Sequence, residues 1–187
     1  MKSLPNILTI SRILVIPLCI GIMLIDNVIS NTVAAWLFAY ACITDFLDGA
    51  LARILNAQTR FGRMLDPIAD KLLVASVIII LVKDGKADLL PSIAIVCREI
   101  LVSGLREFLA KLRVSLPVSS LSKFKTLLQM GAIFVLMLGN TNAGMKGWFI
   151  AGQITLWIAA ALTLFTGYAY LRASYKFFSI TNNKING

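Results

Sequence analysis

Long apolar runs separated by short polar stretches fill most of this chain. A membrane-spanning helix needs about 20 mostly apolar residues. We predict six such helices, in segments 10–25, 32–55, 66–82, 89–110, 124–138 and 148–171. Segment 2–12 alternates apolar and polar residues in a way that is typical of a short amphipathic helix at the membrane surface. The pattern predicts an all-α membrane protein with six transmembrane helices and an N-terminal surface helix.

The composition agrees with this pattern. Of 187 residues, 58% are apolar and 14% are charged, whereas a soluble domain has roughly half apolar and about 25% charged residues. This length predicts a single domain over residues 1–187. A basic start and an apolar run resemble a signal peptide, but no small-residue cleavage site follows, so we expect the first helix to stay attached. The three cysteines form no CxxC pair and there is no histidine, which argues against a disulfide framework or a zinc site.

The basic residues are distributed unequally about the predicted helices. The net charge is +9, from 18 Lys and Arg residues. If the N-terminus is cytoplasmic, only Lys83, Lys86 and Lys146 fall on the far side; Lys71 and Arg98 lie within helices, and all the others lie on the cytoplasmic side. Cytoplasmic loops carry the excess of Lys and Arg in membrane proteins. We therefore predict that both termini are cytoplasmic, and the charge requires no nucleic-acid partner.

Two pairs of carboxylates lie in consecutive apolar segments. Asp45 and Asp48 are spaced i,i+3, and Asp66 and Asp70 are spaced i,i+4, so each pair shares one face of a helix. Charges in membrane helices usually mark function because they are costly there. Because the helices are antiparallel and their link is short, we expect both pairs at one depth near the cytoplasmic surface. Oxygen ligands without His or Cys favour Mg²⁺ or Mn²⁺.

Simpler roles for these carboxylates stay open on the residues alone. Asp66 precedes Pro67 and could be only a helix N-cap. The first pair could form ion pairs with Arg53 or Lys71. Neither role explains why two pairs lie on neighbouring membrane helices, so a metal site is the better interpretation.

The residues around the carboxylates form a recognisable motif. From residue 45 to residue 70 the chain reads DxxDGxxAR, then eight residues, then GxxxDxxxD. It thereby resembles the CDP-alcohol phosphatidyltransferases, which implies six membrane helices and transfer of a phosphatidyl group from a CDP-linked lipid. The resemblance implies two divalent ions held by Asp45, Asp48, Asp66 and Asp70, with Asp70 also the general base.

The same resemblance implies a binding site for the CDP-linked lipid. By this resemblance, the site that receives the CDP group includes Gly49, Arg53 and Thr59. Gly49 has no side chain, so a nucleotide can approach the backbone, and Arg53 offers a fork of donors to a diphosphate. Ala52 is small and shares the Gly49 face, although close helix packing explains it equally well. We add the polar residues of the surface helix, Asn6, Thr9 and Arg12, which would face this cytoplasmic site.

A narrower resemblance covers segments 97–107 and 123–130, which are similar to the bacterial members of the family that make phosphatidylglycerophosphate; Ser122 departs from the glycine expected there. It implies glycerol 3-phosphate as acceptor, a homodimer and the bacterial inner membrane. We predict that the acceptor phosphate binds to Arg98, Arg106, Lys123 and Lys125. Each arginine could instead neutralise the glutamate that follows it, but adjacent residues point apart on a helix, so we expect such pairing to be poor.

Other functions remain open from the sequence. Within the family the acceptor could be inositol phosphate, serine or phosphatidylglycerol, although a serine acceptor would not need so many cations. A cation channel or transporter also uses carboxylates in membrane helices. It predicts polar residues along a path across the bilayer, whereas these acids gather toward one side.

Overall fold

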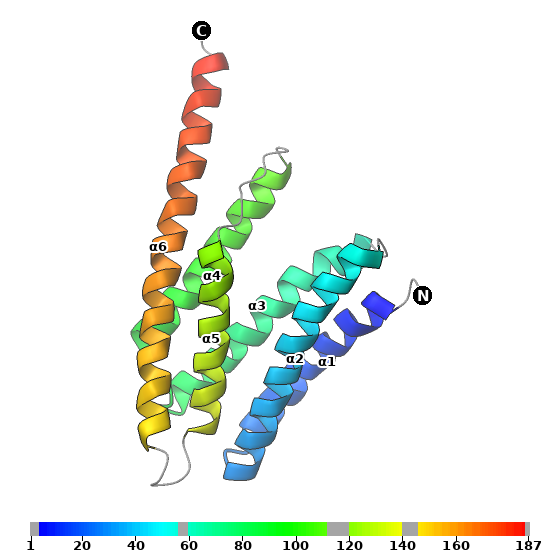
Figure 1. The fold of residues 1–187 in the computed structure, drawn as a ribbon, viewed down its shortest axis with the longest axis vertical. Coiled ribbons are helices and arrows are strands. Elements are labelled where there is room, and N and C mark those ends of the chain that lie inside the picture. Colours follow the sequence, from blue (N-terminus) through cyan, green and yellow to red (C-terminus); the bar gives the residue numbers. More distant parts are fainter. Residues whose placement is uncertain (1–3, 56–59, 112–119, 140–145, 186–187) are drawn as a thin grey trace.

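Six helices account for nearly all the residues that the structure, a computed structural model, describes: 4–55, 60–111, 120–139 and 146–185. They are α1 (Leu4–Met23), α2 (Val28–Leu55), α3 (Arg60–Lys83), α4 (Leu89–Lys111), α5 (Ser120–Leu138) and α6 (Lys146–Ile185) (Figure 1). The predicted all-α fold is therefore confirmed. Consecutive helices run in opposite directions, so the ends of α2 and α4 and the starts of α3 and α5 lie toward one end of the bundle.

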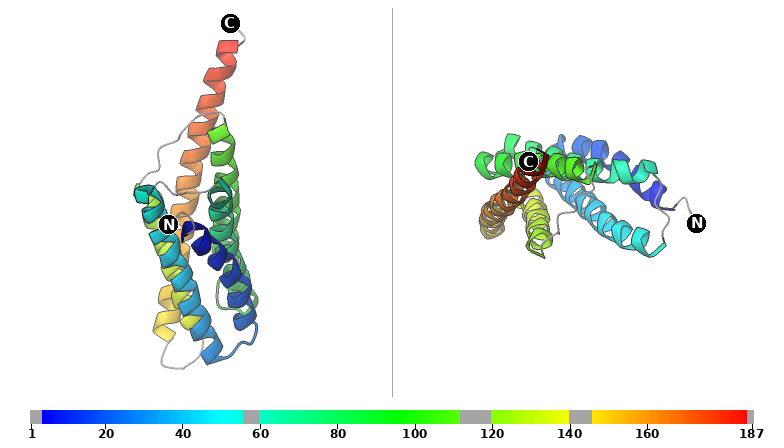
Figure 2. Two further views of the ribbon diagram at one scale, coloured as in Figure 1. Left: turned by 90° about the vertical axis from the view of Figure 1, so that its right-hand side faces the viewer. Right: turned by 90° about the horizontal axis from the view of Figure 1, so that it is seen from above.

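The helices form two groups of three that meet along α3. Helix α1 packs on α2 and α3, while α6 packs on α4 and α5. Helix α3 contacts α1, α2, α4 and α5, and a further contact between α2 and α5 joins the groups (Figure 2). Because α3 is central, its polar side chains are in reach of several other helices.

The bundle has an apolar core and an apolar exterior. Phe38, Val77, Ile133 and Leu136 are at most 1% exposed. Large apolar side chains nevertheless cover the outside as well, among them Trp36 at 64% exposed. Monomeric soluble proteins rarely expose apolar surface on this scale, so the exterior is consistent with lipid as its solvent.

The helix bounds extend the predicted segments. Two helices contain a stretch long and apolar enough to cross a membrane within the residues described, Val28–Asp45 of α2 and Lys146–Arg172 of α6, and two shorter apolar stretches are Ile13–Met23 and Phe124–Leu138. Charges within α3 and α4 interrupt their apolar runs. The chain from Leu4 to Met23 is one continuous helix, so the predicted surface helix is not a separate element.

Local side chains fix where α2 begins. The Ser30 backbone N–H donates to Asn27 Oδ1 at 2.7 Å, and the Asn27 backbone N–H donates to Ser30 Oγ at 3.1 Å. This reciprocal arrangement resembles a capping box, which satisfies backbone N–H groups that have no partner within the helix. Asn27 is therefore the N-cap residue of α2, which begins at Val28 just after the turn from α1.

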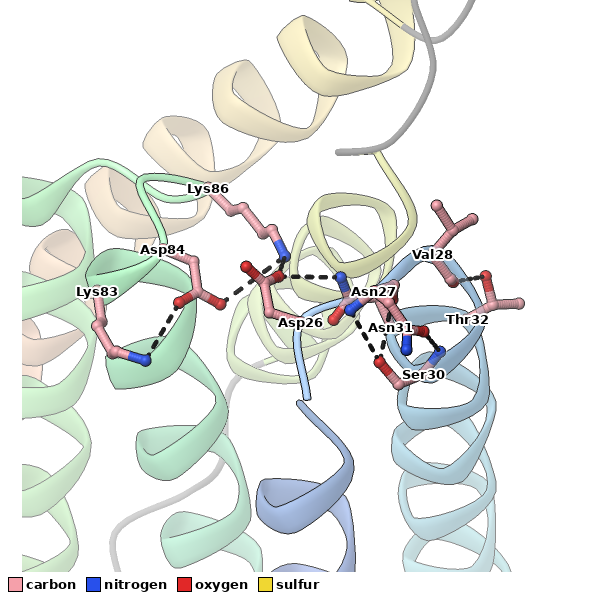
Figure 3. A network of polar contacts seen from close by, with 9 residues as sticks. All are labelled: Asp26, Asn27, Val28, Ser30, Asn31, Thr32, Lys83, Asp84 and Lys86. Carbon is pink, nitrogen blue, oxygen red and sulfur yellow. Dashed lines mark hydrogen bonds and ion pairs between the residues drawn. The ribbon is translucent and has the colours of Figure 1, made fainter. Parts of the chain in front are cut away.

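A polar network joins the α1–α2 and α3–α4 connections (Figure 3). The Lys86 side chain is only 2% exposed, and its Nζ lies 3.0 Å from Asp26 Oδ1 and 3.8 Å from Asp84 Oδ2. The Asn31 amide also reaches Asp26 Oδ1, at 3.4 Å. The hydrogen bond from Lys86 is the chief reason why the pKa of Asp26 lies below its ordinary range. These contacts hold together the end of the bundle that lies away from the two carboxylate pairs of the motif.

Candidate active site

The four motif carboxylates lie on α2 and α3, as their spacing predicts. Asp45 and Asp48 belong to α2, and Asp66 and Asp70 belong to α3. Helix α2 ends at Leu55 and α3 begins at Arg60, and both of these helix ends lie at the same end of the bundle (Figure 1). Asp45 and Asp70 are half-buried; the side chains of Asp48 and Asp66 lie outside what the structure describes.

The donor set fits a hard divalent cation. Within the side chains described, no three carboxylate, Cys or His groups come together as a metal site, and only two of the four motif carboxylates are among those side chains. Both pairs nevertheless stand at helical spacing, on neighbouring helices whose ends adjoin. Carboxylate oxygens alone suit Mg²⁺ or Mn²⁺.

The residues predicted to bind the CDP-linked lipid lie mainly on α1 and α2. Asn6, Thr9 and Arg12 lie on α1, and Gly49, Ala52 and Arg53 lie on α2. Their side-chain positions, like the whole of Thr59, lie outside the described residues. The start of α1 and the end of α2 are at the same end of the bundle as the carboxylate pairs (Figure 1).

A pocket between α3, α4 and α5 brings Asp70 together with groups far away in the sequence. Its polar lining is formed by Asp70, Lys71, Glu99, Thr126 and Gln129. The remaining wall consists of apolar side chains from the same three helices. The predicted general base therefore opens onto the same space as the α4 and α5 segments in which we predicted the acceptor site.

Glu99 joins two of the four predicted phosphate-binding cations. Lys125 donates to Glu99 Oε1, and Arg98 Nη1 donates to the same oxygen at 3.2 Å. Lys125 is 1% exposed and Arg98 is 8% exposed. The expectation that Arg98 would pair poorly with the adjacent Glu99 was wrong, because a long arginine side chain can turn back round the helix to its neighbour.

The Arg98 side chain also packs against α6. Its Nη2 donates to Thr166 Oγ1 at 3.0 Å. A Cβ atom added at Gly167 would lie 2.9 Å from Arg98 Cγ, closer than real Cβ atoms come to their neighbours. The absence of a side chain at Gly167 therefore lets the arginine lie flat against α6 while Thr166 and Glu99 hold its guanidinium.

The other two predicted cations lie apart from this cluster or outside the description. Arg106 is exposed, and its Nη2 donates to the Tyr170 hydroxyl at 3.0 Å. Its guanidinium carbon also lies 5.5 Å from the centre of the Tyr170 ring, within the range of a cation–π contact. The Lys123 side chain lies outside the described set. Arg98 and Lys125 are thus the two cations that share one carboxylate.

Sequence reasoning assigned no role to four residues of this region. Glu99 was considered only as the residue that could neutralise Arg98, and Gln129 lies within segment 123–130, but neither was given a function. Thr166 and Gly167 on the last helix were not considered. A glycine beside a threonine within a membrane helix is a weak signal for close helix packing, and it does not identify the partner.

Comparisons with known proteins agree with the motif. The family model described as CDP-alcohol phosphatidyltransferase matches residues 2–165. A Rickettsia felis protein named CDP-diacylglycerol–glycerol-3-phosphate 3-phosphatidyltransferase is 53% identical over 95% of this chain and 98% of its own.

Two more distant relatives carry the same enzyme name. The Pseudomonas fluorescens protein is 41% identical, over 92% of this chain and 90% of its own. The Arabidopsis thaliana protein, whose name adds "1, chloroplastic/mitochondrial", is 36% identical, over 93% of this chain and 63% of its own. The similarity therefore extends well beyond the carboxylate motif.

Proposed function

Because this chain belongs to the CDP-alcohol phosphatidyltransferase family, we propose that it transfers the phosphatidyl group of CDP-diacylglycerol to sn-glycerol 3-phosphate. The products are phosphatidylglycerophosphate and CMP, so the reaction begins phosphatidylglycerol and cardiolipin synthesis. The observation that carries the proposal is the pocket in which Asp70 and Glu99 face one space, with Arg98 and Lys125 anchored on Glu99. The names of the relatives support this choice of acceptor.

The acceptor phosphate binds beside the Glu99 cluster. Arg98 and Lys125 are both nearly buried, and buried cations attract a phosphate strongly because water screens them little. Glu99 keeps the two cations paired before the acceptor arrives, since an unpaired buried charge is destabilising. Arg106 and Lys123 add positive charge toward the cytoplasmic end of the same helices. Such charge-assisted contacts are the strong class of hydrogen bonds.

Asp70 acts as the general base. Its carboxylate takes the proton from the acceptor hydroxyl, and the oxygen then forms a bond to the phosphorus that carries diacylglycerol. The bond from that phosphorus to the bridging oxygen of the diphosphate breaks, and CMP leaves with that oxygen. Asp70 is half-buried and lines the pocket, so a hydroxyl in the pocket can reach it. No covalent enzyme intermediate is required.

Asp45, Asp48, Asp66 and Asp70 would hold two Mg²⁺ or Mn²⁺ ions. When bound, they neutralise the diphosphate and the charge that develops on the leaving group. The carboxylates themselves keep the site acidic and oxygen-rich, which selects hard cations over softer metals.

The donor binds along α1 and α2. Arg53 presents its planar guanidinium to the diphosphate, and Gly49 and Ala52 leave room for the nucleotide beside the helix. The remaining donor contacts come from Asn6, Thr9, Arg12 and Thr59. The start of α1 and the end of α2 lie at one end of the bundle, where CDP-diacylglycerol can enter from the lipid.

We place the chain as a single domain in the bacterial inner membrane, with six spans. Both termini and the site face the cytoplasm, the first turns of α1 lie at the membrane surface, and two copies form a homodimer. Helix α6 has 40 residues, which corresponds to about 60 Å at 1.5 Å per residue. That length exceeds a hydrocarbon core of about 30 Å, and α6 extends past the other helices (Figure 1), so its C-terminal end would project beyond the membrane.

An acceptor panel tests the proposed function. Purified protein is incubated with labelled CDP-diacylglycerol and, separately, glycerol 3-phosphate, inositol phosphate, serine or phosphatidylglycerol. We expect CMP release and a labelled product with the highest kcat/KM for glycerol 3-phosphate. Preference for another acceptor would change the substrate assignment, and absence of transfer to all four would refute the transferase activity.

A further inference from the structure

One buried polar group in the acceptor pocket has no role in the reaction described above. Gln129 lines the pocket and is 3% exposed. Its Oε1 is buried and has no hydrogen-bond partner in the part of the chain that the structure describes. A buried polar atom without a partner is destabilising by about 1–3 kcal/mol, and most such atoms in proteins are paired. An unpaired amide oxygen in the wall of a pocket therefore suggests a ligand.

The position of Gln129 relates it to the phosphate and to the base. It follows Lys125 by four residues on α5, so the two side chains share a helix face, one turn apart. Asp70 lines the same pocket from α3. With its phosphate near Lys125 and its reacting hydroxyl near Asp70, a three-carbon acceptor would have its middle carbon between these points, in the pocket that Gln129 also lines.

The chemistry of the lining suits a hydroxyl. Asp70 and Glu99 are hydrogen-bond acceptors when ionised, and the amide of Gln129 can both accept and donate. The Glu99 carboxylate is already paired with Arg98 and Lys125, and Asp70 is assigned to the reacting hydroxyl. Lys71 and Thr126 also line the pocket, and both already take part in other interactions. The Gln129 Oε1 has no partner among the described residues and is therefore available to a second hydroxyl.

We propose that Gln129 is a specificity-determining residue that hydrogen-bonds the middle, non-reacting hydroxyl of glycerol 3-phosphate. This inference rests on the proposed function and deepens it, because it assigns recognition of the polyol to one amide. A site built to bind a hydroxyl discriminates against an analogue that lacks it, since its polar group is then left unpaired.

The test combines a substrate change with a side-chain change. The analogue is propane-1,3-diol monophosphate, which keeps a primary hydroxyl and the phosphate but lacks the middle hydroxyl. We expect the wild type to favour glycerol 3-phosphate by at least about fivefold in kcat/KM, the size of one such hydrogen bond. Gln129→Met keeps an unbranched side chain of similar length without the amide. It should remove most of this preference by lowering kcat/KM for glycerol 3-phosphate, with that for the analogue nearly unchanged.

Two further variants keep the test decisive. Gln129→Leu replaces Gln129→Met if the latter does not fold. Gln153→Met is the matched control, because Gln153 pairs with Asp88 at the opposite end of the bundle and should leave the preference unaltered. Equal losses with both substrates, or an unchanged preference, would overturn the role of Gln129 while leaving the transferase assignment intact. A wild type that does not use glycerol 3-phosphate but uses another acceptor would instead overturn the proposed function.

Discussion

A single methyl group at residue 167 tests how α6 positions the acceptor site. In Gly167→Ala the new Cβ would lie 2.9 Å from Arg98 Cγ and 3.5 Å from Arg98 Nε. Cγ belongs to the stem of the arginine, and the guanidinium is held by Glu99 and Thr166 at 3.2 and 3.0 Å. The side chain therefore cannot swing away without losing at least one of these hydrogen bonds.

The expected magnitude follows from three contributions. Overpacking of this kind is destabilising by about 1–3 kcal/mol, and a lost hydrogen bond to a charged group adds about 1.5–3 kcal/mol. Replacing glycine by alanine within a helix offsets about 1 kcal/mol. We therefore expect Gly167→Ala to lower the free energy of unfolding by about 2 kcal/mol or more. A displaced Arg98 should also raise the KM for glycerol 3-phosphate about tenfold, which corresponds to about 1.4 kcal/mol.

The assay measures thermal unfolding in detergent and steady-state kinetics with each substrate varied separately. Gly104→Ala is the control, because Gly104 is exposed on α4 and an added Cβ there meets no atom within 4 Å. A double-mutant cycle with Arg98→Ala isolates the contact, since the effect of Gly167→Ala should disappear once the arginine is removed. An unchanged Tm and acceptor KM in Gly167→Ala, or full additivity with Arg98→Ala, would refute the reasoning.

Three further predictions concern the base, the metal and the far end of the bundle. Asp70→Asn should lower kcat by about 10²–10⁴-fold while retaining CDP-diacylglycerol binding; loss of donor binding instead would make Asp70 chiefly a metal ligand. EDTA should abolish turnover and added Mg²⁺ or Mn²⁺ restore it, so full activity in metal-free buffer would contradict the carboxylate site. The pKa of Asp26 is lowered in the folded state, chiefly by the hydrogen bond from Lys86. The ionised Asp26 therefore stabilises the fold at pH values above its ordinary pKa of about 3.9. This stabilisation is lost as the pH falls through the lower pKa of the folded state. Asp26→Asn should remove this part of the acid sensitivity, and identical Tm–pH curves below about pH 5 would disprove it.

Local patterns in the sequence predicted the elements well. The apolar runs give all six helices, and the i,i+3 and i,i+4 spacings of the carboxylates are realised within α2 and α3. Both features depend only on residues a few positions apart, so periodicity reports them directly. The helix bounds differ where periodicity ends before the helix does: α6 continues to Ile185, beyond the predicted limit of 171.

Partners distant in the chain could not be predicted in the same way. Arg98 and Thr166 are 68 residues apart and meet only because α4 packs on α6. The sequence marks Arg98 as a charge in a membrane helix, but nothing in its neighbourhood specifies a hydroxyl and a glycine on the last helix. The contact between Arg106 and Tyr170 has the same origin. Side-chain reach matters too, because helix geometry alone predicted that Arg98 and Glu99 would point apart.

The order of polar and apolar layers distinguishes an enzyme from a channel. Along α3, the pocket residue Asp70 is followed by the buried Val77 and Ile78. Asp84 and Lys86 of the far-end network come only after the helix has ended at Lys83. A cation path across the bilayer requires polar groups at every depth to replace water around the ion.

Other helices repeat this layering. On α5 the buried Ile133 and Leu136, both 0% exposed, follow Gln129, and on α4 Ile95, also 0% exposed, lies between the far end and Glu99. Within the residues that the structure describes, an apolar layer therefore separates the pocket from the far end. At that end Lys86 forms ion pairs with Asp26 and Asp84. Because this apolar layer separates the polar groups of the pocket from those of the far end, the distribution favours a site that opens to one side of the membrane.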